Sequence, residues 1–391
     1  MPSRKKVNMW NSTGAEAPIP TVDVLVAGLG PGGCAAALAA RAEGLSTLAV
    51  EARGPQANRG QLVLVRPGAQ AALRHLGLPD ITEGRRTTTI RHVENRLRSA
   101  LVAAAQADAS GAQAVLPTAP SFEHRWNTSV VGLDVGVDRV LVTLRGEEAG
   151  ADRIVAARHV IDASGGRLES LGRPARARAG PGHLVITAEY AAVPWFEGIV
   201  GVRDKATHEL YLLFPTWGRR GVIAYFDARP GSGGDGAALA QRFEAMAESL
   251  ALGPPLQPAW AVDVFQRMLA RPQLDRVLPI GDAVGTVDVL LGAGMSIAIE
   301  DGVEAACGIA AAQRDPSAQG ELSQVRTASE RIFARHRSRA RQGRLMLAVR
   351  PVLERAWPSA VLPAVGRETL GPPPLLWPAV RFVFGRRPQA S

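Results

Sequence analysis

The stretch VDVLVAGLGPGGCAAALAARAEGLSTLAVEA, from Val22 to Ala52, decides the fold of this chain. Its first six residues are continuously apolar, which is typical of a strand in a buried parallel sheet. A glycine-rich turn follows, and then an alanine-rich segment at 34–43 that we expect to be a helix ending at Gly44. A second apolar run at 46–50 has the pattern of a strand. The stretch therefore predicts a strand–helix–strand unit at the start of the fold.

Three glycines and one acid in this stretch form a dinucleotide-binding pattern. Gly28, Gly30 and Gly33 give the spacing GxGxxG: the first permits a tight turn, the second lets backbone approach a pyrophosphate, and the third lets helix and strand pack closely. Glu51 ends the second expected strand, where an acid hydrogen-bonds a ribose hydroxyl and disfavours the 2′-phosphate of NADP. A chance glycine loop is the alternative. The preceding strand, the following helix and the distance to the acid argue against it.

A second glycine-rich segment, LPIGDAVGTVDVLLGAGMSIAIEDGVEAA at 278–306, distinguishes FAD from NAD. It has the pattern of a strand, a Gly-Asp turn and a glycine-rich turn into a helix. Asp282 can bind the ribityl hydroxyls of a flavin, although a helix cap is the alternative for this residue alone. Backbone N–H groups at a helix start around Gly292, Gly294 and Met295 can stabilise negative charge on the isoalloxazine ring. A simple NAD dehydrogenase has no use for this element, so we expect FAD.

The patterns GLGPGG…E and GDAxG…GxGM together resemble those of FAD-dependent oxidoreductases of the para-hydroxybenzoate hydroxylase fold, over residues 21–325. This superfamily includes aromatic hydroxylases, epoxidases, halogenases and geranylgeranyl reductases, so the resemblance is specific for fold and cofactor but not for reaction. It implies an α/β fold: a Rossmann-type FAD-binding domain with an inserted antiparallel-sheet substrate domain, followed here by a helical C-terminal tail.

The resemblance also implies cofactor contacts for arginines. In NRGQLVLVRPGAQAALRHLGL, Arg59 is similar to the arginine that contacts the flavin side of the cofactor. In TTTIRHVENRLRSALVAAA, Arg91 is similar to the arginine that reaches the pyrophosphate. For both, a solvated surface position is the alternative. Arg53, two residues after Glu51, is a further cofactor-binding candidate.

The chain departs from the hydroxylase pattern at two places. Ser164, in the sequence DASGG, stands where hydroxylases carry an aspartate linked to cofactor and NADPH handling, and Gly285 stands where many of them have histidine. The first departure resembles halogenases and reductases, and the second resembles geranylgeranyl reductases, which argues against a hydroxylase-type NADPH cycle. A halogenase is disfavoured because no lysine lies between residues 7 and 204 and a WxWxIP motif is absent.

The resemblance implies a monooxygenase that hydroxylates or epoxidises a small apolar or aromatic substrate with molecular oxygen, through a flavin C4a-hydroperoxide. The alternatives are an FAD-dependent C=C reductase of the geranylgeranyl reductase type and a non-catalytic redox-sensing flavoprotein docked by a basic tail. The flavin carries the redox chemistry, so no catalytic side chain is assigned. The sequence has no second GxGxxG domain for a nicotinamide. We therefore expect the electrons to come from transiently bound NAD(P)H or from a separate flavin reductase.

Four regions are expected along the chain. They are a leader at 1–20, the FAD-binding domain at 21–183 and 270–325, a substrate-binding sheet domain at 184–269, and a basic helix with a proline-rich tail at 326–391. The strands LYLLFP and GVIAYF are expected in the sheet that covers the flavin. Tyr211, Phe214 and Trp217 are candidates for lining the substrate pocket, with ordinary sheet core as the alternative for each.

The net charge of +9 comes from the C-terminal region, because twelve arginines stand against two glutamates from residue 331 onward. Residues 343–391 combine arginine with tryptophan and proline. This composition fits contact with a membrane surface, a lid over the body, or a docking arm. Nucleic acid is not an expected partner, because no nucleic-acid-binding module accompanies the basic segment.

Cysteine and histidine usage suggests no metal site. Cys34 and Cys307 form neither a CxxC pair nor a metal-ligand spacing, and the seven histidines are scattered. The N-terminus lacks the apolar core of a secretory signal, and no uncharged apolar run is long enough to span a membrane as a helix. We expect reduced thiols in a cytoplasmic protein, with peripheral membrane contact as an open alternative.

Overall fold

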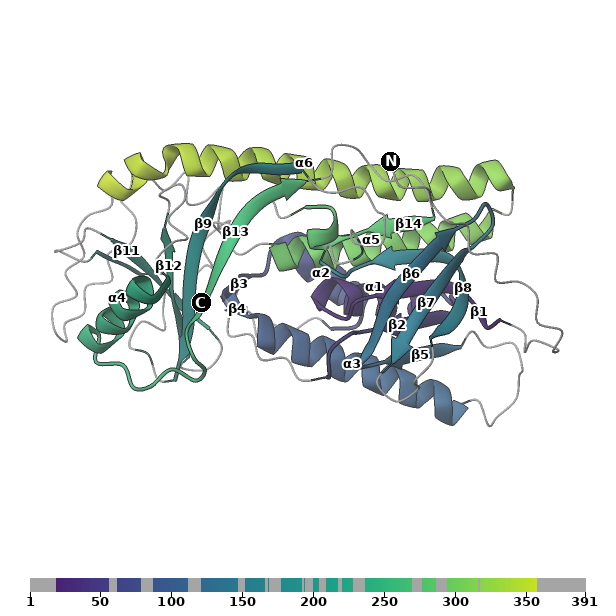
Figure 1. The fold of residues 1–391 in the computed structure, drawn as a ribbon, viewed down its shortest axis with the longest axis horizontal. Helices are drawn as coiled ribbons and strands as arrows, with labels where there is room; N and C mark the ends of the chain where they lie inside the picture. The colour runs from purple at the N-terminus through teal and green to yellow at the C-terminus, as the bar shows by residue number, and fades with distance from the viewer. Residues whose placement is uncertain are drawn as a thin grey trace, which may run out of the picture.

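The computed structural model of the chain contains two bodies joined side by side (Figure 1). It describes residues 19–55, 62–78, 87–111, 121–146, 152–165, 168, 177–191, 193, 200–203, 209–216, 220–227, 236–268, 276–285, 294–315 and 317–356. The first body holds the large mixed sheet and most of the helices. The second holds a separate antiparallel sheet covered by one helix.

The large sheet of the first body is built around the opening strand. Its strands are β1 (Thr21–Ala27), β2 (Thr47–Val50), β5 (Phe122–Arg125), β6 (Thr128–Val135), β7 (Val140–Gly146), β8 (Arg153–Asp162) and β14 (Val277–Pro279). Their order is β5-β2-β1-β8-β7-β6, with β14 paired to the C-terminal part of β8. Ala27 pairs with Val50 on one side and with Asp162 on the other. These parallel strands therefore end at one edge of the sheet, where open α/β sheets bind their ligands.

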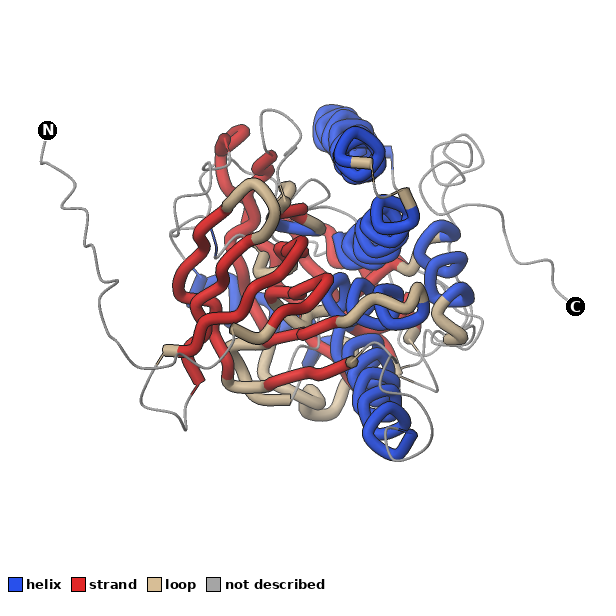
Figure 2. Tube along the Cα trace, turned by 90° about the vertical axis from the view of Figure 1, so that its right-hand side faces the viewer, coloured by secondary structure: helices blue, strands red, loops and turns tan. Residues whose placement is uncertain are grey.

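Helices cover one side of this sheet. They are α1 (Pro31–Ala42), α2 (Pro67–His75), α3 (Ile90–Gly111), α5 (Gly294–Arg314) and α6 (Ala318–Ala356). Figure 2 shows the helices gathered on one side and most strands on the other. Helices α1 and α5 approach closely through small residues: a Cβ on Gly302 would lie 2.4 Å from the Gly32 carbonyl oxygen. This contact joins the start of the fold to the segment that follows the second glycine-rich motif.

The second body is a five-stranded antiparallel sheet with α4 (Gly236–Ser249) against one face. Its strands are β9 (Ala177–Tyr190), β10 (Val200–Arg203), β11 (Leu210–Pro215), β12 (Gly221–Asp227) and β13 (Trp260–Met268), in the order β10-β11-β12-β9-β13. Tyr211, Tyr225 and Phe243 pack between the sheet and α4. A short hairpin-like pair, β3 (Leu62–Leu64) and β4 (Thr87–Thr89), lies near β11.

The two bodies are tied together along α6 and the long strands (Figure 1). Helix α6 passes over both, and Met268 at the end of β13 packs against Ile297 of α5 and Ala340 of α6. On the first body, Glu321 near the start of α6 contacts His159 of β8 at 3.1 Å and accepts a hydrogen bond from Arg276 at 2.7 Å. Helix α6 therefore contacts both bodies and helps to fix their relative position.

The expected fold class is confirmed: a Rossmann-type domain, an antiparallel-sheet insertion and a C-terminal helix. Some bounds differ from the expected regions. The second sheet begins at Ala177 rather than at 184, and α6 begins at Ala318, so the expected boundary at 325 falls inside one helix. Residues 1–18 of the expected leader, and the tail beyond 356, lie outside the described residues.

Among the described residues, no helix is both long enough and apolar enough to cross a membrane.

Candidate cofactor site

The three glycines of the first glycine-rich loop differ in the space around their Cβ positions. Gly28 has a φ of +104°, and a Cβ there would lie 2.5 Å from the carbonyl oxygen of Ala163. A Cβ on Gly33 would lie 1.8 Å from the Gly28 carbonyl oxygen. Gly30, between them, has nothing within 4 Å of its Cβ position. Gly28 and Gly33 therefore close the turn, and the space above Gly30 remains open.

The open space faces the N-terminus of α1. Gly30 is the N-cap residue and Pro31 occupies the first turn, so no side-chain cap satisfies the N–H groups that begin this helix. Uncapped N–H groups and the helix dipole together favour a negatively charged ligand such as a pyrophosphate.

Glu51 ends β2 beside this loop and is 5% exposed. Its carboxylate accepts hydrogen bonds from the Leu29 N–H at 2.8 Å and from the Arg53 Nε at 3.0 Å. Burial opposes ionisation, but the bonds from Leu29 and Arg53 outweigh it and hold the pKa of Glu51 below its ordinary value. The acid is therefore charged and held at the loop, as a ribose-binding carboxylate must be.

Arg98 of α3 contacts the same loop, and sequence reasoning missed this residue. The side chain is 6% exposed; its Nη1 donates to the Pro55 carbonyl at 2.6 Å and its Nη2 to the Leu29 carbonyl at 3.5 Å. The guanidinium also lies 5.1 Å from the centroid of the Trp126 ring. From the sequence alone, Arg98 cannot be distinguished from the solvent-exposed arginines expected on the same helix.

The second glycine-rich element comes to the same edge of the sheet. The turn Gly281–Ala283 follows β14, and the Ile280 N–H donates to the Asp162 carbonyl at 2.9 Å. Asp282 is exposed in this turn, whereas Met295 is buried in the first turn of α5. Nothing lies within 4 Å of the Cβ position of Gly294. Gly292 lies outside the described residues.

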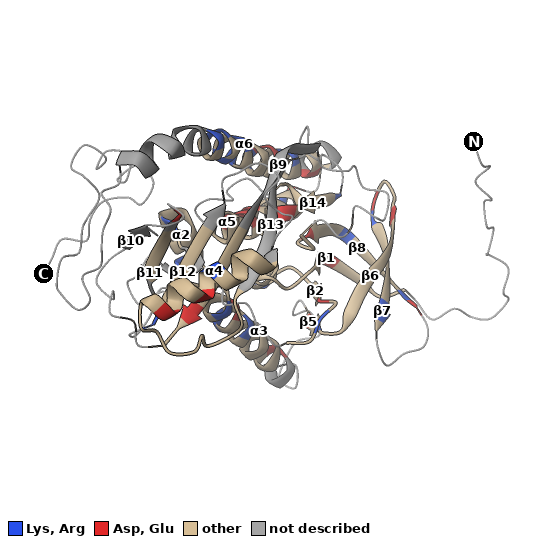
Figure 3. Ribbon diagram, turned by 60° about the vertical axis from the view of Figure 1, so that its left-hand side comes forward, with Lys and Arg blue, Asp and Glu red and all other residues tan. Residues whose placement is uncertain are grey.

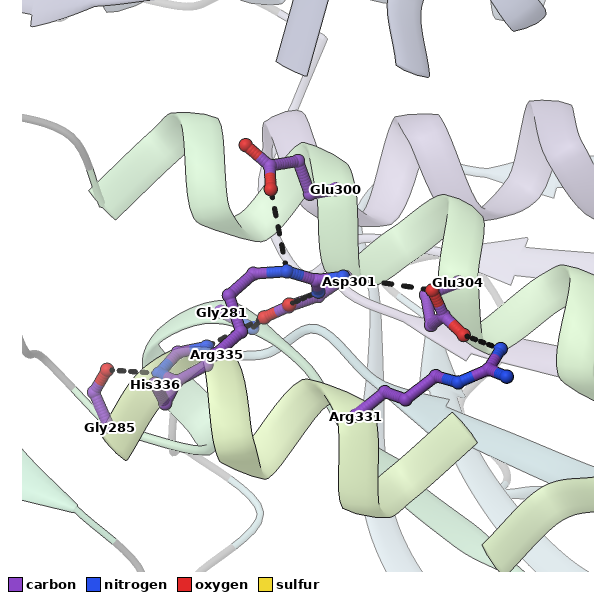
Figure 4. A network of polar contacts seen from close by, with 8 residues as sticks. All are labelled: Gly281, Gly285, Glu300, Asp301, Glu304, Arg331, Arg335 and His336. Carbon is purple, nitrogen blue, oxygen red and sulfur yellow. Dashed lines mark hydrogen bonds and ion pairs between the residues drawn. The ribbon is translucent and has the colours of Figure 1, made fainter. Parts of the chain in front are cut away.

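A buried ionic network fixes both ends of this turn (Figure 4). Asp301 of α5 is 0% exposed; it accepts from the Gly281 N–H at 3.1 Å, from His336 Nε2 at 2.6 Å and from Arg335. His336 of α6 also contacts the Gly285 carbonyl oxygen through Nδ1 at 3.1 Å. Both partners of His336 are acceptors, so both contacts are hydrogen bonds only when the ring carries two protons.

Arg66 is the N-cap residue of α2. Its N–H donates to Ser296 Oγ at 3.1 Å, which joins the start of α2 to the start of α5. Its Nη1 is buried and has no hydrogen-bond partner in the structure. Arg59 itself lies outside the described residues. An unsatisfied guanidinium nitrogen beside the α5 N-terminus suits a ligand that carries acceptor atoms.

Arg91 lies at the start of α3, and its guanidinium forms an ion pair with Glu189 of β9. Glu189 belongs to the second sheet, so this pair joins the two bodies. Arg53, by contrast, is bonded to Glu51 at the nucleotide loop. The cofactor contacts expected of these two arginines remain predictions.

The three aromatic candidates for the substrate pocket have different places. Tyr211 is fully buried between the second sheet and α4, with its ring 5.0 Å from that of Tyr225, and its hydroxyl donates to Glu209. Phe214 lies on the opposite face of the same strand, because side chains alternate along β11. Trp217 lies outside the described residues. Of the two candidates that the structure describes, Phe214 therefore points away from α4 and Tyr211 points toward it.

Ser164, which departs from the hydroxylase pattern, lies beside the first glycine loop. Its Oγ donates to Asp162 Oδ1 at 2.6 Å, and its Cα is 3.1 Å from the Cβ position of Gly28. The first glycine-rich loop therefore packs against the backbone of Ala163 and Ser164.

The residues at this edge suit FAD. The open position above Gly30, the charged Glu51, the exposed Asp282 and the buried, unpartnered Arg66 Nη1 come from distant parts of the sequence. Open backbone N–H groups suit a pyrophosphate, and carboxylates and a guanidinium suit the hydroxyl and acceptor groups of FAD. The individual cofactor contacts remain predictions.

Neither cysteine has the environment of a reactive thiol. Burial raises the pKa of Cys34 to about 12, and its Sγ donates to the Leu29 carbonyl. Glu43, His75 and Cys307 do place ligand atoms within 4.8 Å of one another. Glu43 is already paired with Arg314 at 2.7 Å, and burial raises the pKa of Cys307 to about 11, which opposes thiolate formation.

Solved structures share this fold at low sequence identity. PqsL of P. aeruginosa, in complex with 2-aminobenzoylacetate, matches with a TM-score of 0.65 and 17% identity, covering 84% of this chain and 96% of that chain. The p-nitrophenol 4-monooxygenase PnpA of Pseudomonas putida DLL-E4 matches with a TM-score of 0.62 and 18% identity, covering 85% and 94%. The flavin-dependent brominase Bmp2 matches with a TM-score of 0.68 and 16% identity, covering 93% of both chains. No curated protein sequence matches this chain.

A family model described as an FAD binding domain matches residues 21–337. The match includes both glycine-rich elements, the second sheet and the first half of α6. With the shared fold, it confirms the expected FAD-dependent oxidoreductase of the para-hydroxybenzoate hydroxylase type. The chain belongs to the family of FAD binding domain proteins.

Proposed function

We propose that the protein is an FAD-dependent monooxygenase that hydroxylates or epoxidises a small, largely apolar or aromatic molecule with molecular oxygen. The observation that carries the proposal is the arrangement of the two bodies. Helix α3 contacts the first glycine-rich loop through Arg98, and through the Arg91–Glu189 pair it contacts the face of the second sheet opposite α4. In a flavoprotein of this fold, a substrate enclosed there is shielded from water beside the reactive ring.

The residues of this chain have binding and positioning roles in the proposal. The N-terminus of α1 and Glu51 hold the pyrophosphate and ribose, and Asp282 and the start of α5 hold the ribityl chain and the ring edge. When bound, the flavin supplies the electrons and activates the oxygen, so no side chain is required as a nucleophile. The second sheet orients the substrate and excludes water.

The substrate is proposed to be small because the fold neighbours PqsL and PnpA act on or bind single-ring molecules according to their names. In this chain Phe214 supplies an apolar side chain on the face of β11 opposite α4, beside Val222 of β12. Electrons are proposed to come from NAD(P)H that binds transiently or from a separate flavin reductase.

The test is stopped-flow absorbance of the FAD-loaded protein. The flavin is reduced anaerobically and mixed with oxygenated buffer, and spectra are recorded until the oxidised flavin returns. A transient spectrum that differs from those of both reduced and oxidised flavin is expected, and it should persist longer than for free reduced FAD. Substrate screening would then begin with aromatic compounds and alkenes.

Slow reoxidation without such a transient would count against the monooxygenase. Anaerobic oxidation of the reduced protein by an unsaturated isoprenoid would then support a C=C reductase. A purified protein that binds no flavin at all would overturn both functions.

A further inference from the structure

Three helices that begin near the cofactor site meet again at a surface cluster. Helix α1 begins at the first glycine-rich loop, and the starts of α2 and α5 are joined by the bond from Arg66 to Ser296. At about 1.5 Å per residue, α1 places its C-terminal end roughly 18 Å from that loop. Glu43, the C-cap of α1, His75, the last residue of α2, and Cys307 of α5 lie together there. This cluster is therefore separate from the cofactor site.

The side chains of the cluster have the ligand atoms and the spacing of a zinc site. A carboxylate oxygen, an imidazole nitrogen and a sulfur atom all lie within 4.8 Å of one another, and Cys307 Sγ is 3.7 Å from Glu43 Oε1. In a tetrahedral site with zinc–ligand bonds of about 2.0–2.3 Å, neighbouring ligand atoms are about 3.3–3.8 Å apart. The thiol and the carboxylate already have this separation, and a rotation of the exposed His75 side chain can close the remaining distance.

The charges around the cluster favour a divalent cation. The C-terminal ends of α1 and α2 meet here, and a helix C-terminus carries partial negative charge that attracts cations. Burial raises the pKa of Cys307 to about 11, and the carboxylates of Glu43 and Glu304 add to that rise, whereas Arg314 opposes it. Apart from burial, negative charge therefore holds the proton on the thiol, and a divalent cation neutralises the same charge more fully.

The ion pair that Glu43 makes in the structure does not block a metal ion. Arg314, the last residue of α5, donates to Glu43 Oε2 at 2.7 Å, but the Arg314 side chain is 68% exposed. An exposed ion pair contributes little to stability, because water solvates both charges well when they separate. A metal ion can therefore take the place of the guanidinium at the carboxylate.

We propose that Glu43, His75 and Cys307 bind one Zn²⁺ ion, with water as the fourth ligand, and that the ion links the C-terminal ends of α1 and α2 to α5. Zinc is bound by carboxylate oxygen, imidazole nitrogen and thiolate sulfur, whereas Mg²⁺ takes oxygen ligands. The ion displaces the thiol proton, which passes to solvent. The three residues are far apart in the sequence, so no metal-ligand spacing marks them there. The site is independent of the reaction at the flavin.

The test is zinc titration of the FAD-loaded full chain from which metal ions have been removed with a chelator. Calorimetry should show one Zn²⁺ per chain, with a Kd of about 1 μM or tighter. At a zinc concentration about 100 times the Kd, the Tm should rise by about 3–5 °C, because the folded chain binds the ion and the unfolded chain does not hold the three ligands together. Mg²⁺ at the same concentrations should have neither effect.

Cobalt identifies the sulfur ligand. Co²⁺ bound in place of Zn²⁺ should give a difference spectrum with thiolate-to-metal charge-transfer absorption and the visible bands of tetrahedral cobalt. Cys34 is the one other cysteine of the chain and is 0% exposed, so the charge-transfer absorption would come from Cys307. Cys307→Ser should abolish this absorption. It should also weaken zinc binding by more than the roughly 10–100-fold that loss of an outer-shell partner costs.

Three further variants locate the ion. Glu43→Gln and His75→Gln should each weaken zinc binding at least about tenfold, because each removes a direct ligand. Arg314→Ala should have the opposite effect and strengthen zinc binding about two- to fivefold, since Glu43 no longer has to give up an exposed ion pair. His92→Gln is the matched control. His92 lies in α3 outside the cluster, and its variant should bind zinc like the wild-type protein.

No one-to-one zinc binding by the wild-type chain would overturn the site, as would equal binding of Mg²⁺. Wild-type affinity in Cys307→Ser, or a cobalt spectrum without thiolate charge transfer, would overturn the ligand set. Weaker zinc binding in Arg314→Ala would contradict displacement of the guanidinium and would overturn it as well. The cobalt spectrum and the magnesium comparison use the wild-type protein, so a variant that fails to fold leaves the proposal open to refutation. None of these measurements needs turnover.

Discussion

Gly28 and Gly30 lie two residues apart in one loop and are required for opposite reasons. A side chain at Gly28 would need an unfavourable positive φ and would also meet the Ala163 carbonyl oxygen at 2.5 Å. At Gly30 the backbone has a φ of −68°, which any residue adopts, and the space is open. The GxGxxG pattern therefore contains two glycines that the fold needs, Gly28 and Gly33, and one, Gly30, at which the fold leaves room for a side chain.

Substitution by alanine should separate these two requirements. Gly28→Ala is expected to destabilise the apoprotein by several kcal/mol, as expected for overpacking combined with backbone strain, and to prevent FAD binding. Gly30→Ala should change the stability of the apoprotein by at most about 1 kcal/mol, the usual cost of alanine at an N-cap, but weaken FAD binding at least about tenfold. Urea unfolding of the apoproteins and quenching of FAD fluorescence measure the two effects. Normal FAD affinity in Gly30→Ala would place the pyrophosphate elsewhere.

We expect the stability of the folded protein to depend on pH through His159 of β8. It is 1% exposed, and burial, together with Arg276, lowers its pKa to about 4, against an opposing contribution from Glu321. The unfolded chain therefore binds a proton at this residue between pH 6.5 and 4 that the folded protein does not bind. Proton uptake by the unfolded chain therefore lowers the free energy of unfolding as the pH falls from 6.5 toward 4. Above pH 6.5 this stability is fully present.

The loss at pH 4 is expected to be roughly 3 kcal/mol, at about 1.4 kcal/mol for each pKa unit. His159→Gln cannot take up the proton and should flatten the acid side of the stability profile measured by urea unfolding from pH 7 to 4. His75→Gln, at the exposed end of α2, is the control and should leave the profile unchanged. An equally steep loss in His159→Gln would assign the acid sensitivity to other groups.

Local sequence patterns predict individual helices and strands, but they do not predict contacts between elements that are far apart in the sequence. The opening strand–helix–strand unit and α5 follow from periodicity and glycine placement, because each depends on neighbouring residues. Strand β13 (Trp260–Met268) was missed, because its alternation is imperfect and its partner, β9, lies about 80 residues earlier in the chain. Arg98, Arg66 and Glu189 were missed for the same reason: their roles come from partners on other elements.

Helix α6 positions the second cofactor loop through Asp301. Removing one partner from a buried ion pair leaves an uncompensated charge, which costs about 3–5 kcal/mol. Asp301→Asn keeps the shape of the side chain but removes the charge that pairs with Arg335 and His336. We expect it to lower the free energy of unfolding by about this amount and to weaken FAD binding, because the turn from Gly281 to Gly285 loses its anchor.

The control for this prediction lies in α6. Arg331 pairs with Glu304 at 3.2 Å, but its side chain is 67% exposed, so Arg331→Ala should change stability by less than about 1 kcal/mol. Urea unfolding of the apoproteins and FAD titration give both quantities for each variant. If Asp301→Asn unfolds at the wild-type urea concentration and binds FAD normally, the loop is held by its glycines and not by α6.

At the scale of the whole molecule, the basic charge is distributed along one element. Figure 3 shows blue arginine positions along the ribbon of α6, and Figure 1 shows that α6 passes over both bodies. Several of its arginines pair with acids of neighbouring elements, as Arg335 does with Glu300, Asp301 and Glu304. The positive charge of α6 is therefore partly used within the fold. Residues 357–391 add four arginines against one glutamate.

Residues 357–391 carry a net positive charge and two tryptophans. The charged residues are Arg367, Arg381, Arg386, Arg387 and Glu368, and the tryptophans are Trp357 and Trp377. Each net basic residue near an anionic membrane contributes about 1 kcal/mol, so this segment should bind vesicles containing anionic lipid but not neutral ones. We expect the full chain to cosediment with anionic vesicles at low salt and to be released by high salt, and a chain ending at Ala356 to stay unbound while keeping its FAD. Equal sedimentation of the two chains would exclude a membrane role for the segment. If the shorter chain also lost oxygen-dependent turnover, the segment would instead act as a lid, because a membrane anchor has no reason to affect the reaction in solution.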